Sequence, residues 1–333
     1  MTLEGFSLVV KVGFVGCGGI AHTHMDRLRK IREARMVAFY DIVPEKAREA
    51  AKSVEAKAYT SLQEMLDKEE LDAVYVCVPP FAHGFEPEIV ERGINIFVEK
   101  PVALSIDVAK KIESAIRKAG VLSSVGYMWR YFDTTVLARE VLKENGPVGM
   151  VEGLYIDPFW FPPGHWWIDK RKSGGQVIEQ STHVFDLARY LVGDVTRVYA
   201  ELDTLLLTDV PGFKTEDVSL VTLKFKSGAI GVILSTCASR KTFTGTGLKI
   251  IAKKAVVEHG GHSGILKIYR DDEVREIRPT VDSYLEEDRT FIRAVATEDG
   301  SEIRSPYSDA VKTLEVTIAA NKAAEKARVV VIQ

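Results

Sequence analysis

A lysine at the end of an apolar segment is the first side chain in this sequence that could do chemistry. Residues 96–98 are apolar, and Glu99, Lys100 and Pro101 follow at once. An amine at the end of a buried strand can hold a hydroxyl group or take part in a proton transfer. A solvated strand end is the alternative reading. The secondary structure predicted around Lys100 has to distinguish a functional amine from a solvated strand end.

A second candidate group lies in residues 172–194, KSGGQVIEQSTHVFDLARYLVGD. Glu179 and His183 are four residues apart, and Asp186 follows three residues later. We predict one helix between the glycine pair and the last glycine of this segment, and on it these spacings put the three side chains on roughly one face. A carboxylate beside an imidazole orients the ring and raises its basicity, as a proton-transfer pair requires. An internal ion pair on a helix face is the structural alternative.

An aromatic loop precedes this segment. Residues 164–170, GHWWIDK, contain His165, Trp166, Trp167 and Lys170. Aromatic rings with a few polar groups suit a sugar-like ligand, so Trp166 and Trp167 are predicted to contact a substrate. Ordinary core or subunit contacts would explain the same residues.

A glycine-rich loop near the start of the chain points to a dinucleotide. Gly16, Gly18 and Ala21 form a GxGxxA pattern between a predicted strand and a predicted helix, with Gly19 and Ile20 at the helix start. The first glycine permits a tight turn, the second lets the backbone approach a pyrophosphate, and the small third residue lets helix and strand pack closely. The helix N-terminus supplies free N–H groups for phosphate.

An acid at the end of the next predicted strand strengthens this interpretation. Asp41 lies 20 residues after Ala21, where a carboxylate would hold a ribose diol. Ile42 and Val43 follow it, so no cation is present there for a 2′-phosphate, and NAD is favoured over NADP. A solvated strand end or a cap for the helix at Pro44 is the alternative role of Asp41.

The segment CVPPFAH, residues 77–83, closes a further predicted strand. The carboxyl ends of strands in a doubly wound sheet border the cofactor crevice, so Pro79 and His83 are predicted near the cofactor. His83 could equally cap or pack against the next helix, and we favour that structural role.

Predicted strands and helices alternate in the first part of the chain, and these elements must position the candidate residues. Such alternation predicts βαβ units and a parallel sheet, here an N-terminal Rossmann domain over residues 1–125. The predicted strands cover residues 8–15, 36–41, 71–78, 94–100 and 122–127, and the clearest helices cover residues 44–54 and 105–120.

The pattern of predicted secondary structure changes after about residue 126. Long alternating segments predict that residues 126–333 form an α/β domain on a large, open, mostly antiparallel sheet that binds substrate and makes subunit contacts. The clear helix at 309–327 is expected to pack back toward the first domain. A second subunit is a natural cover for the open sheet face, so a homo-dimer or homo-tetramer is expected.

Bulk composition limits the function classes. The chain has 333 residues, a net charge of −3 and no basic block, which argues against nucleic acid or an anionic membrane as the main partner. The N-terminal residues lack a secretory pattern, no apolar run could span a bilayer, and the three cysteines are far apart, so a reduced, cytoplasmic setting is expected. The loose histidine pairs, 22/24 and 259/262, lack supporting ligands, and no metal site is expected.

Together these motifs resemble the Gfo/Idh/MocA oxidoreductases, named for glucose–fructose oxidoreductase, inositol dehydrogenase and a rhizopine-catabolism protein. The resemblance covers almost the whole chain, from GCGGIA and Asp41 through CVPPFAH, the EKP at 99–101, VGYMWRY and SGGQVIEQSTHVFD to the helical tail. It implies hydride transfer between a nicotinamide and a secondary hydroxyl or carbonyl of a sugar or polyol.

The resemblance also implies roles for particular residues. The family's EKP lysine falls on Lys100, near the cofactor together with Glu99, and in contact with the substrate hydroxyl. Its helix histidine falls on His183, with the preceding acid, commonly aspartate, replaced here by Glu179. These three are the predicted catalytic residues, and Lys100 and His183 also bind substrate. Two alternatives come from other relatives: a glycosidase that uses transient oxidation by NAD, and a non-catalytic dinucleotide-binding regulator.

Overall fold

The computed structural model describes residues 9–332 and divides into two compact units. Residue 8 of the first predicted strand, and the first residues of the segment without a secretory pattern, lie outside the described part. Within the described residues, the first unit comprises residues 9–102, 107–128 and 282–308, and the second comprises residues 103–106, 129–281 and 309–332. The predicted boundary between residues 125 and 126 did not anticipate the return of residues 282–308 to the first unit.

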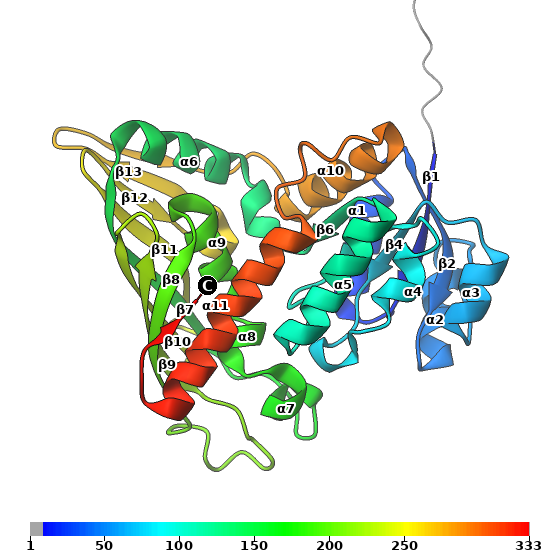
Figure 1. The fold of residues 1–333 in the computed structure, drawn as a ribbon, viewed down its shortest axis with the longest axis horizontal. Coiled ribbons are helices and arrows are strands. Elements are labelled where there is room, and N and C mark those ends of the chain that lie inside the picture. The colour runs from blue at the N-terminus through cyan, green and yellow to red at the C-terminus, as the bar shows by residue number, and fades with distance from the viewer. Residues whose placement is uncertain (1–8, 333) are drawn as a thin grey trace, which may run out of the picture. The chain divides into compact units, whose positions relative to one another are not determined.

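The first unit is built on a six-stranded parallel sheet in the order β3-β2-β1-β4-β5-β6 (Figure 1). Its strands are β1 (Val10–Val15), β2 (Ala34–Tyr40), β3 (Lys57–Tyr59), β4 (Ala73–Val76), β5 (Asn95–Val98) and β6 (Ser123–Val125). Its helices are α1 (Gly19–Leu28), α2 (Pro44–Lys52), α3 (Leu62–Lys68), α4 (Glu86–Val90), α5 (Ile106–Ala119) and α10 (Ser283–Thr297), with a 3-10 turn, η1 (Pro80–Ala82). This arrangement confirms the predicted Rossmann domain.

An aromatic stack holds α10 to this sheet. Phe14, Tyr75 and Phe97 from three adjacent strands stack with ring centroids 5.2 Å and 4.6 Å apart. Phe291 of α10 packs edge-on against Tyr75 and Phe97, and Ile292 lies in the same buried cluster. Strands covered on both faces are apolar almost throughout, which is why β4 and β5 were recognisable in the sequence.

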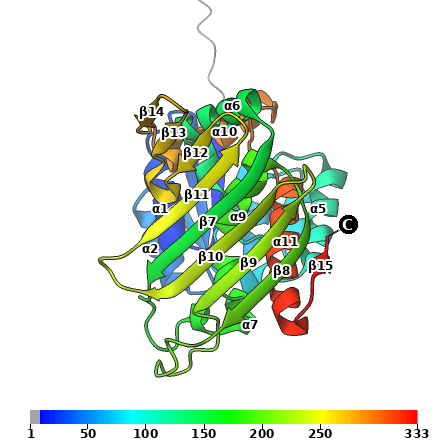
Figure 2. The ribbon, with the colours of Figure 1, turned by 90° about the vertical axis from the view of Figure 1, so that its left-hand side faces the viewer.

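The second unit carries a nine-stranded sheet in the order β14-β13-β12-β11-β7-β10-β9-β8-β15 (Figure 2). It is antiparallel except for the β7–β10 pair, which confirms the predicted large, mostly antiparallel sheet. Its strands are β7 (Val148–Pro158), β8 (Val195–Asp203), β9 (Val218–Phe225), β10 (Ile230–Ser239), β11 (Gly245–Ala252), β12 (Val256–His259), β13 (Leu266–Tyr269), β14 (Val274–Ile277) and β15 (Val330–Val331).

Helices cover one face of this sheet, and α9 contacts both β7 and β11. The helices are α6 (Asp133–Asn145), α7 (Lys170–Ser173), α8 (Gln176–Glu179), α9 (Thr182–Val192) and α11 (Tyr307–Lys326), and the 3-10 turns are η2 (Met128–Tyr131), η3 (Trp166–Ile168) and η4 (Gly261–Ser263). Among residues 9–332, no helix has the length and apolar character that crossing a membrane requires.

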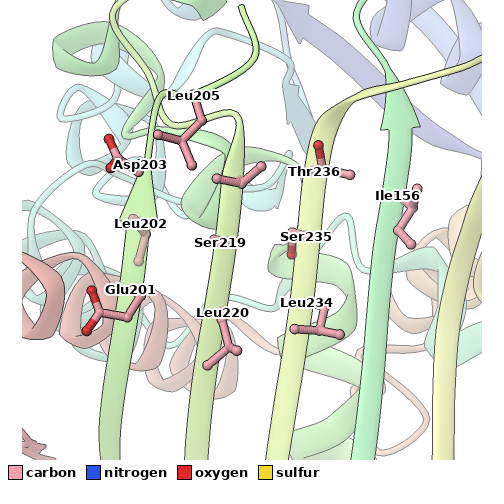
Figure 3. Close-up of a pocket in the computed structure, with 11 residues that line it drawn as sticks. Ile156, Glu201, Leu202, Asp203, Leu205, Ser219, Leu220, Leu234, Ser235 and Thr236 are labelled. Carbon is pink, nitrogen blue, oxygen red and sulfur yellow. The ribbon is translucent and has the colours of Figure 1, made fainter.

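The other face of the sheet is open in the single chain (Figure 2). Leu220 of β9 pairs with Leu234 of β10, and Leu234 pairs in turn with Leu154 of β7, so the three leucines form a line across neighbouring strands. Leu220 is 40% and Leu234 37% exposed. A shallow pocket lies along the same strands, lined by Leu234, Leu220 and Ile156 among others (Figure 3). This face therefore exposes apolar side chains in a continuous row.

Candidate active site

The glycine loop has the geometry that close phosphate approach requires. Gly16 has φ +87°, and a Cβ there would lie 2.4 Å from the Cys77 carbonyl oxygen, so only glycine fits this turn. A Cβ on Gly18 or Gly19 would meet nothing within 4 Å, which leaves open space beside the loop. The N–H groups of Gly19 and Ile20 open α1 and have no acceptor within the helix. These residues fit a pyrophosphate.

Asp41 lies directly beside this loop. Its Oδ2 accepts the backbone N–H of Cys17, and its Oδ1 accepts that of Val43, both at 2.8 Å. Each carboxylate oxygen retains a second lone pair, so two ribose hydroxyls could still be held. Asp41 is not the N-cap of α2, because Val43 occupies that position. Ile42 is 86% exposed, and residues 42–43 present no cation.

His83 is held by a neighbouring carboxylate. Its Nδ1 lies 2.5 Å from Oε1 of Glu86, whose other oxygen accepts the backbone N–H of Gly84 at 2.7 Å. The His83 side chain is 1% exposed. These contacts fit the structural role favoured from the sequence, while Pro79 lies half-buried at the start of η1.

Lys100 follows β5 at the same edge of the parallel sheet as Gly16 and Asp41, because parallel strands place their carboxyl ends together. Lys100 is half-buried, and its peptide bond to Pro101 is cis. The Glu99 side chain, predicted to contact the cofactor, is 4% exposed and bonded inside the unit. One oxygen accepts the Lys100 backbone N–H at 3.1 Å, and the other lies 2.9 Å from a ring nitrogen of His24.

In the second unit, the prediction of one helix between the glycine pair and Gly193 is wrong. This stretch forms two helices, α8 and α9, with Gly174 (φ +81°) and Gly175 (φ +94°) before α8 and a break at Gln180–Ser181 before α9. A Cβ on Gly175 would lie 2.4 Å from Oε2 of the buried Glu216, whose Oε1 accepts the backbone N–H of Val177 in α8. The close approach of this carboxylate starts a new short helix, which the spacing of apolar residues could not reveal.

Asp186 does not belong to the candidate proton-transfer group. Its carboxylate pairs with both Nε (2.7 Å) and an Nη (2.5 Å) of the buried Arg130, and it accepts from Thr313 of α11 at 2.9 Å. Asp309 bonds the same guanidinium at 2.6 Å. Burial opposes the charge on Arg130, but the two carboxylates outweigh it and raise the Arg130 pKa. This ion pair fixes α9 against α11.

Glu179 and His183 lie on opposite sides of the helix break. Glu179 is half-buried, and its Oε2 accepts the indole N–H of Trp167 at 2.7 Å. Trp167 is fully buried, so its predicted direct contact with a substrate does not fit the structure, and it supports Glu179 instead. Trp166 is half-buried beside His165, and Trp160, which the sequence did not single out, is 64% exposed.

Two aromatic residues beside His183 were missed from the sequence. The His183 ring lies 5.2 Å from Trp129 and 6.4 Å from His262, and the Trp129 and His262 rings lie 5.0 Å apart. Tyr155 of β7 lies 6.0 Å from His262. The only sequence signal for Trp129 was its place in VGYMWRY, and nothing marked His262 beyond a loose histidine pair.

His259 is linked to this cluster by hydrogen bonds through Thr135. Its Nδ1 accepts the backbone N–H of Gly261 at 3.1 Å, so Nε2 carries the hydrogen and donates to Thr135 Oγ1 at 2.8 Å. Thr135 in turn donates to the Trp129 carbonyl at 2.6 Å. Burial lowers the pKa of His259 to about 4, so the ring is neutral near pH 7.

Comparisons with known proteins identify the class. A family model described as an oxidoreductase family with an NAD-binding Rossmann fold matches residues 10–127, and the GFO/IDH/MocA C-terminal domain matches residues 136–258. Myo-inositol 2-dehydrogenase of Thermotoga maritima is 30% identical over 97% of this chain and 99% of its own length. The chain belongs to the Gfo/Idh/MocA family, so it is an oxidoreductase with NAD as its cofactor.

Two further relatives deserve comparison. The NAD-dependent scyllo-inositol 2-dehydrogenase of Bacillus subtilis is 28% identical over 67% of this chain and 66% of its own length. Levoglucosan dehydrogenase, solved with NADH and levoglucosan, has the same fold, with a TM-score of 0.89 at 19% identity over 97% of this chain and 99% of that one.

Proposed function

We propose that this enzyme transfers a hydride between NAD and a secondary hydroxyl or carbonyl group of a sugar or polyol. The observation that carries the proposal is the glycine loop, Asp41 and Lys100 at one edge of the parallel sheet. One relative that matches over nearly the full length is named myo-inositol 2-dehydrogenase, which supports a polyol as the substrate class.

Asp41 favours NAD over NADP in this proposal. Its carboxylate lies against the glycine loop and would repel a 2′-phosphate, while Ile42 and Val43 supply no compensating charge. The exposed Ile42 is available for contact with the adenosine part of the cofactor.

Lys100 and His183 are the proposed groups for the substrate proton. The bound nicotinamide supplies the hydride acceptor, and the protein must orient the substrate hydroxyl and remove its proton. Lys100 offers an amine with its backbone fixed by Glu99, and His183 offers an imidazole packed against Trp129. Glu179, held by Trp167, is the proposed acceptor for a further substrate hydroxyl.

The test is a screen of inositols, sugars and other polyols with NAD, followed by NADH absorbance. The proposal predicts net NADH from at least one polyol, and a weaker response with NADP. NAD that co-purifies with the protein, together with glycoside cleavage and no net NADH, would instead support the transient-oxidation alternative. No turnover in either direction across the panel would count against the proposal.

We also propose that a second copy of the chain covers the open face of the nine-stranded sheet. The line of leucines on β7, β9 and β10 and the exposed Ile230 (55%) give this face an apolar character that water does not favour. Two such faces are self-complementary about a two-fold axis, as in most homodimers.

A further inference from the structure

A row of three charged side chains lies buried in the first unit beside Lys100. Nδ1 of His24, on α1, lies 2.8 Å from Oδ1 of Asp288 on α10, and Nε2 lies 2.9 Å from Oε1 of Glu99. His24 and Asp288 are 0% exposed, and Glu99 is 4% exposed. Both ring nitrogens of His24 thus face carboxyl oxygens, the arrangement in which an imidazolium donates a hydrogen bond from each nitrogen.

The charge on His24 is consistent with its surroundings. Burial opposes the charged form, but the attraction and hydrogen bonds of Asp288 and Glu99 outweigh burial and raise the His24 pKa well above its ordinary value. The row thus places one imidazole between two carboxyl groups.

Glu99 connects the row to Lys100. Its Oε2 accepts the Lys100 backbone N–H at 3.1 Å. On its other side the carboxylate lies against the backbone of Gly126, where a Cβ would be 2.4 Å from Oε1. The Glu99 carboxylate is thus held between His24, the backbone of Gly126 and the backbone N–H of Lys100.

We propose that Glu99 is a positioning residue for Lys100, and that His24 and Asp288 keep it in place. The inference rests on the proposed role of Lys100 in proton transfer. His24 has a second effect, because its positive charge offsets part of the negative charge that Glu99 and Asp288 place near Lys100. Loss of His24 would leave two buried carboxyl groups without that charge and favour a cation on the Lys100 side chain.

The other titratable groups around His24 do not replace it as the partner of the Glu99 carboxylate. The rings of Tyr75 on β4 and Tyr284 on α10 lie 5.4 Å and 6.0 Å from His24, and burial raises the pKa of both phenols. Burial also raises the pKa of the Cys77 thiol well above its ordinary value. Further charged groups near this cluster include Glu287 on α10, Arg27 on α1, whose guanidinium lies over the Tyr284 ring, and Asp282, which pairs with Arg27.

The competing explanation is purely structural: the row only ties α10 to the sheet. Ile292, one turn beyond Asp288 and 1% exposed, provides the matched control, because Ile292→Ala loosens the same helix without touching a charge. If His24→Gln and Glu99→Gln lose more kcat than Ile292→Ala at an equal loss of stability, the additional loss therefore comes from Glu99 and His24 themselves.

The experiment compares His24→Gln, Glu99→Gln and Ile292→Ala with the wild type. Trinitrobenzenesulfonate labels neutral amines, and mass spectrometry of the Lys100 peptide gives its labelling rate against pH in the cofactor-free protein. We expect His24→Gln to move the labelling midpoint up by about one pH unit, and Glu99→Gln not to raise it. We also expect both variants to lower kcat about tenfold or more, with the Kd for NAD within about threefold of the wild type.

The opposite results would overturn the proposal. An unmoved midpoint in His24→Gln, or a loss of kcat in both variants no larger than that of Ile292→Ala, would leave only a structural role. If His24→Gln does not fold, the kcat of Glu99→Gln against that of Ile292→Ala decides the question. If the wild type oxidises no polyol, the proposed function fails, whereas the labelling profile still tests the positioning role.

Discussion

Gly18 allows the cofactor site to be tested without disturbing the fold. Its backbone has φ −83° and ψ −168°, an extended conformation that alanine adopts freely, and an added Cβ would meet no atom within 4 Å. Gly18→Ala should therefore fold normally. Its free energy of unfolding should stay the same or rise by about 0.4–1 kcal/mol, because alanine restricts the unfolded chain.

The same methyl group would occupy the space through which a pyrophosphate approaches the loop. Forcing one extra carbon into a fitted contact costs about 1–3 kcal/mol. That range corresponds to a Kd for NAD about 5- to 150-fold weaker than that of the wild type. Titration of NAD by calorimetry, with melting curves of the cofactor-free proteins, measures both quantities.

Gly16→Ala is the matched control in the same loop. Gly16 has φ +87°, and its Cβ would lie 2.4 Å from a backbone oxygen, so this variant should lose stability before any cofactor is added. We expect its melting temperature to fall by about 4 °C or more. An unchanged NAD affinity in Gly18→Ala, or a loss of stability as large as that of Gly16→Ala, would refute the assignment of this loop to the pyrophosphate.

Three further predictions concern Asp41, His259 and the open sheet. Asp41→Asn removes a charged acceptor worth about 1.5–3 kcal/mol, so the Kd for NAD should rise about tenfold or more while that for NADP changes less; an equal change in both would contradict the ribose role. The pKa of His259 is about 4 in the folded state, below the unfolded value of about 6.5, so its stability contribution is complete above pH 6.5 and about 3 kcal/mol is lost as the pH falls toward 4. Urea unfolding at pH 7.5 and 4.5 should show a larger drop in the free energy of unfolding for the wild type than for His259→Gln, in which residue 259 does not titrate. Equal drops would show that His259 is not the cause of this pH dependence. Leu234→Glu should give a monomer by light scattering, whereas Val136→Glu, an exposed apolar position on α6, should keep the wild-type mass; a monomeric wild type would exclude the proposed sheet interface.

Most of the first unit could be predicted because its parallel strands are buried on both faces. The apolar segments at 71–78 and 94–100 contain β4 and β5, and the glycine loop could be placed because only glycine fits its turn. The strand β3 was missed, since its three residues carry too little periodicity, and the seven-residue helix α3 was missed as well. The helix α10 was missed as well, and with it the second carboxylate on His24.

The candidate site was predictable where one segment carries the signal, and not where distant segments meet. Asp288 lies 264 residues from His24, and Asp309 lies 179 residues from Arg130, so no spacing rule connects either pair. The helix predicted around His183 breaks at residues 180–181, which the spacing of its residues did not reveal. Two remote groups also act on this segment: Glu216 accepts a backbone N–H at the start of α8, and Arg130 pairs with Asp186.

The central claim is that Lys100 handles the substrate proton beside a bound NAD. The most direct measurement compares NADH formation by the wild type and by Lys100→Ala, at saturating NAD and with the best polyol from the screen. We predict that the rate falls about 10²- to 10⁴-fold, the usual contribution of a proton-transfer group, while the Kd for NAD stays within about threefold. A variant that retains more than about a third of the wild-type rate would contradict the claim.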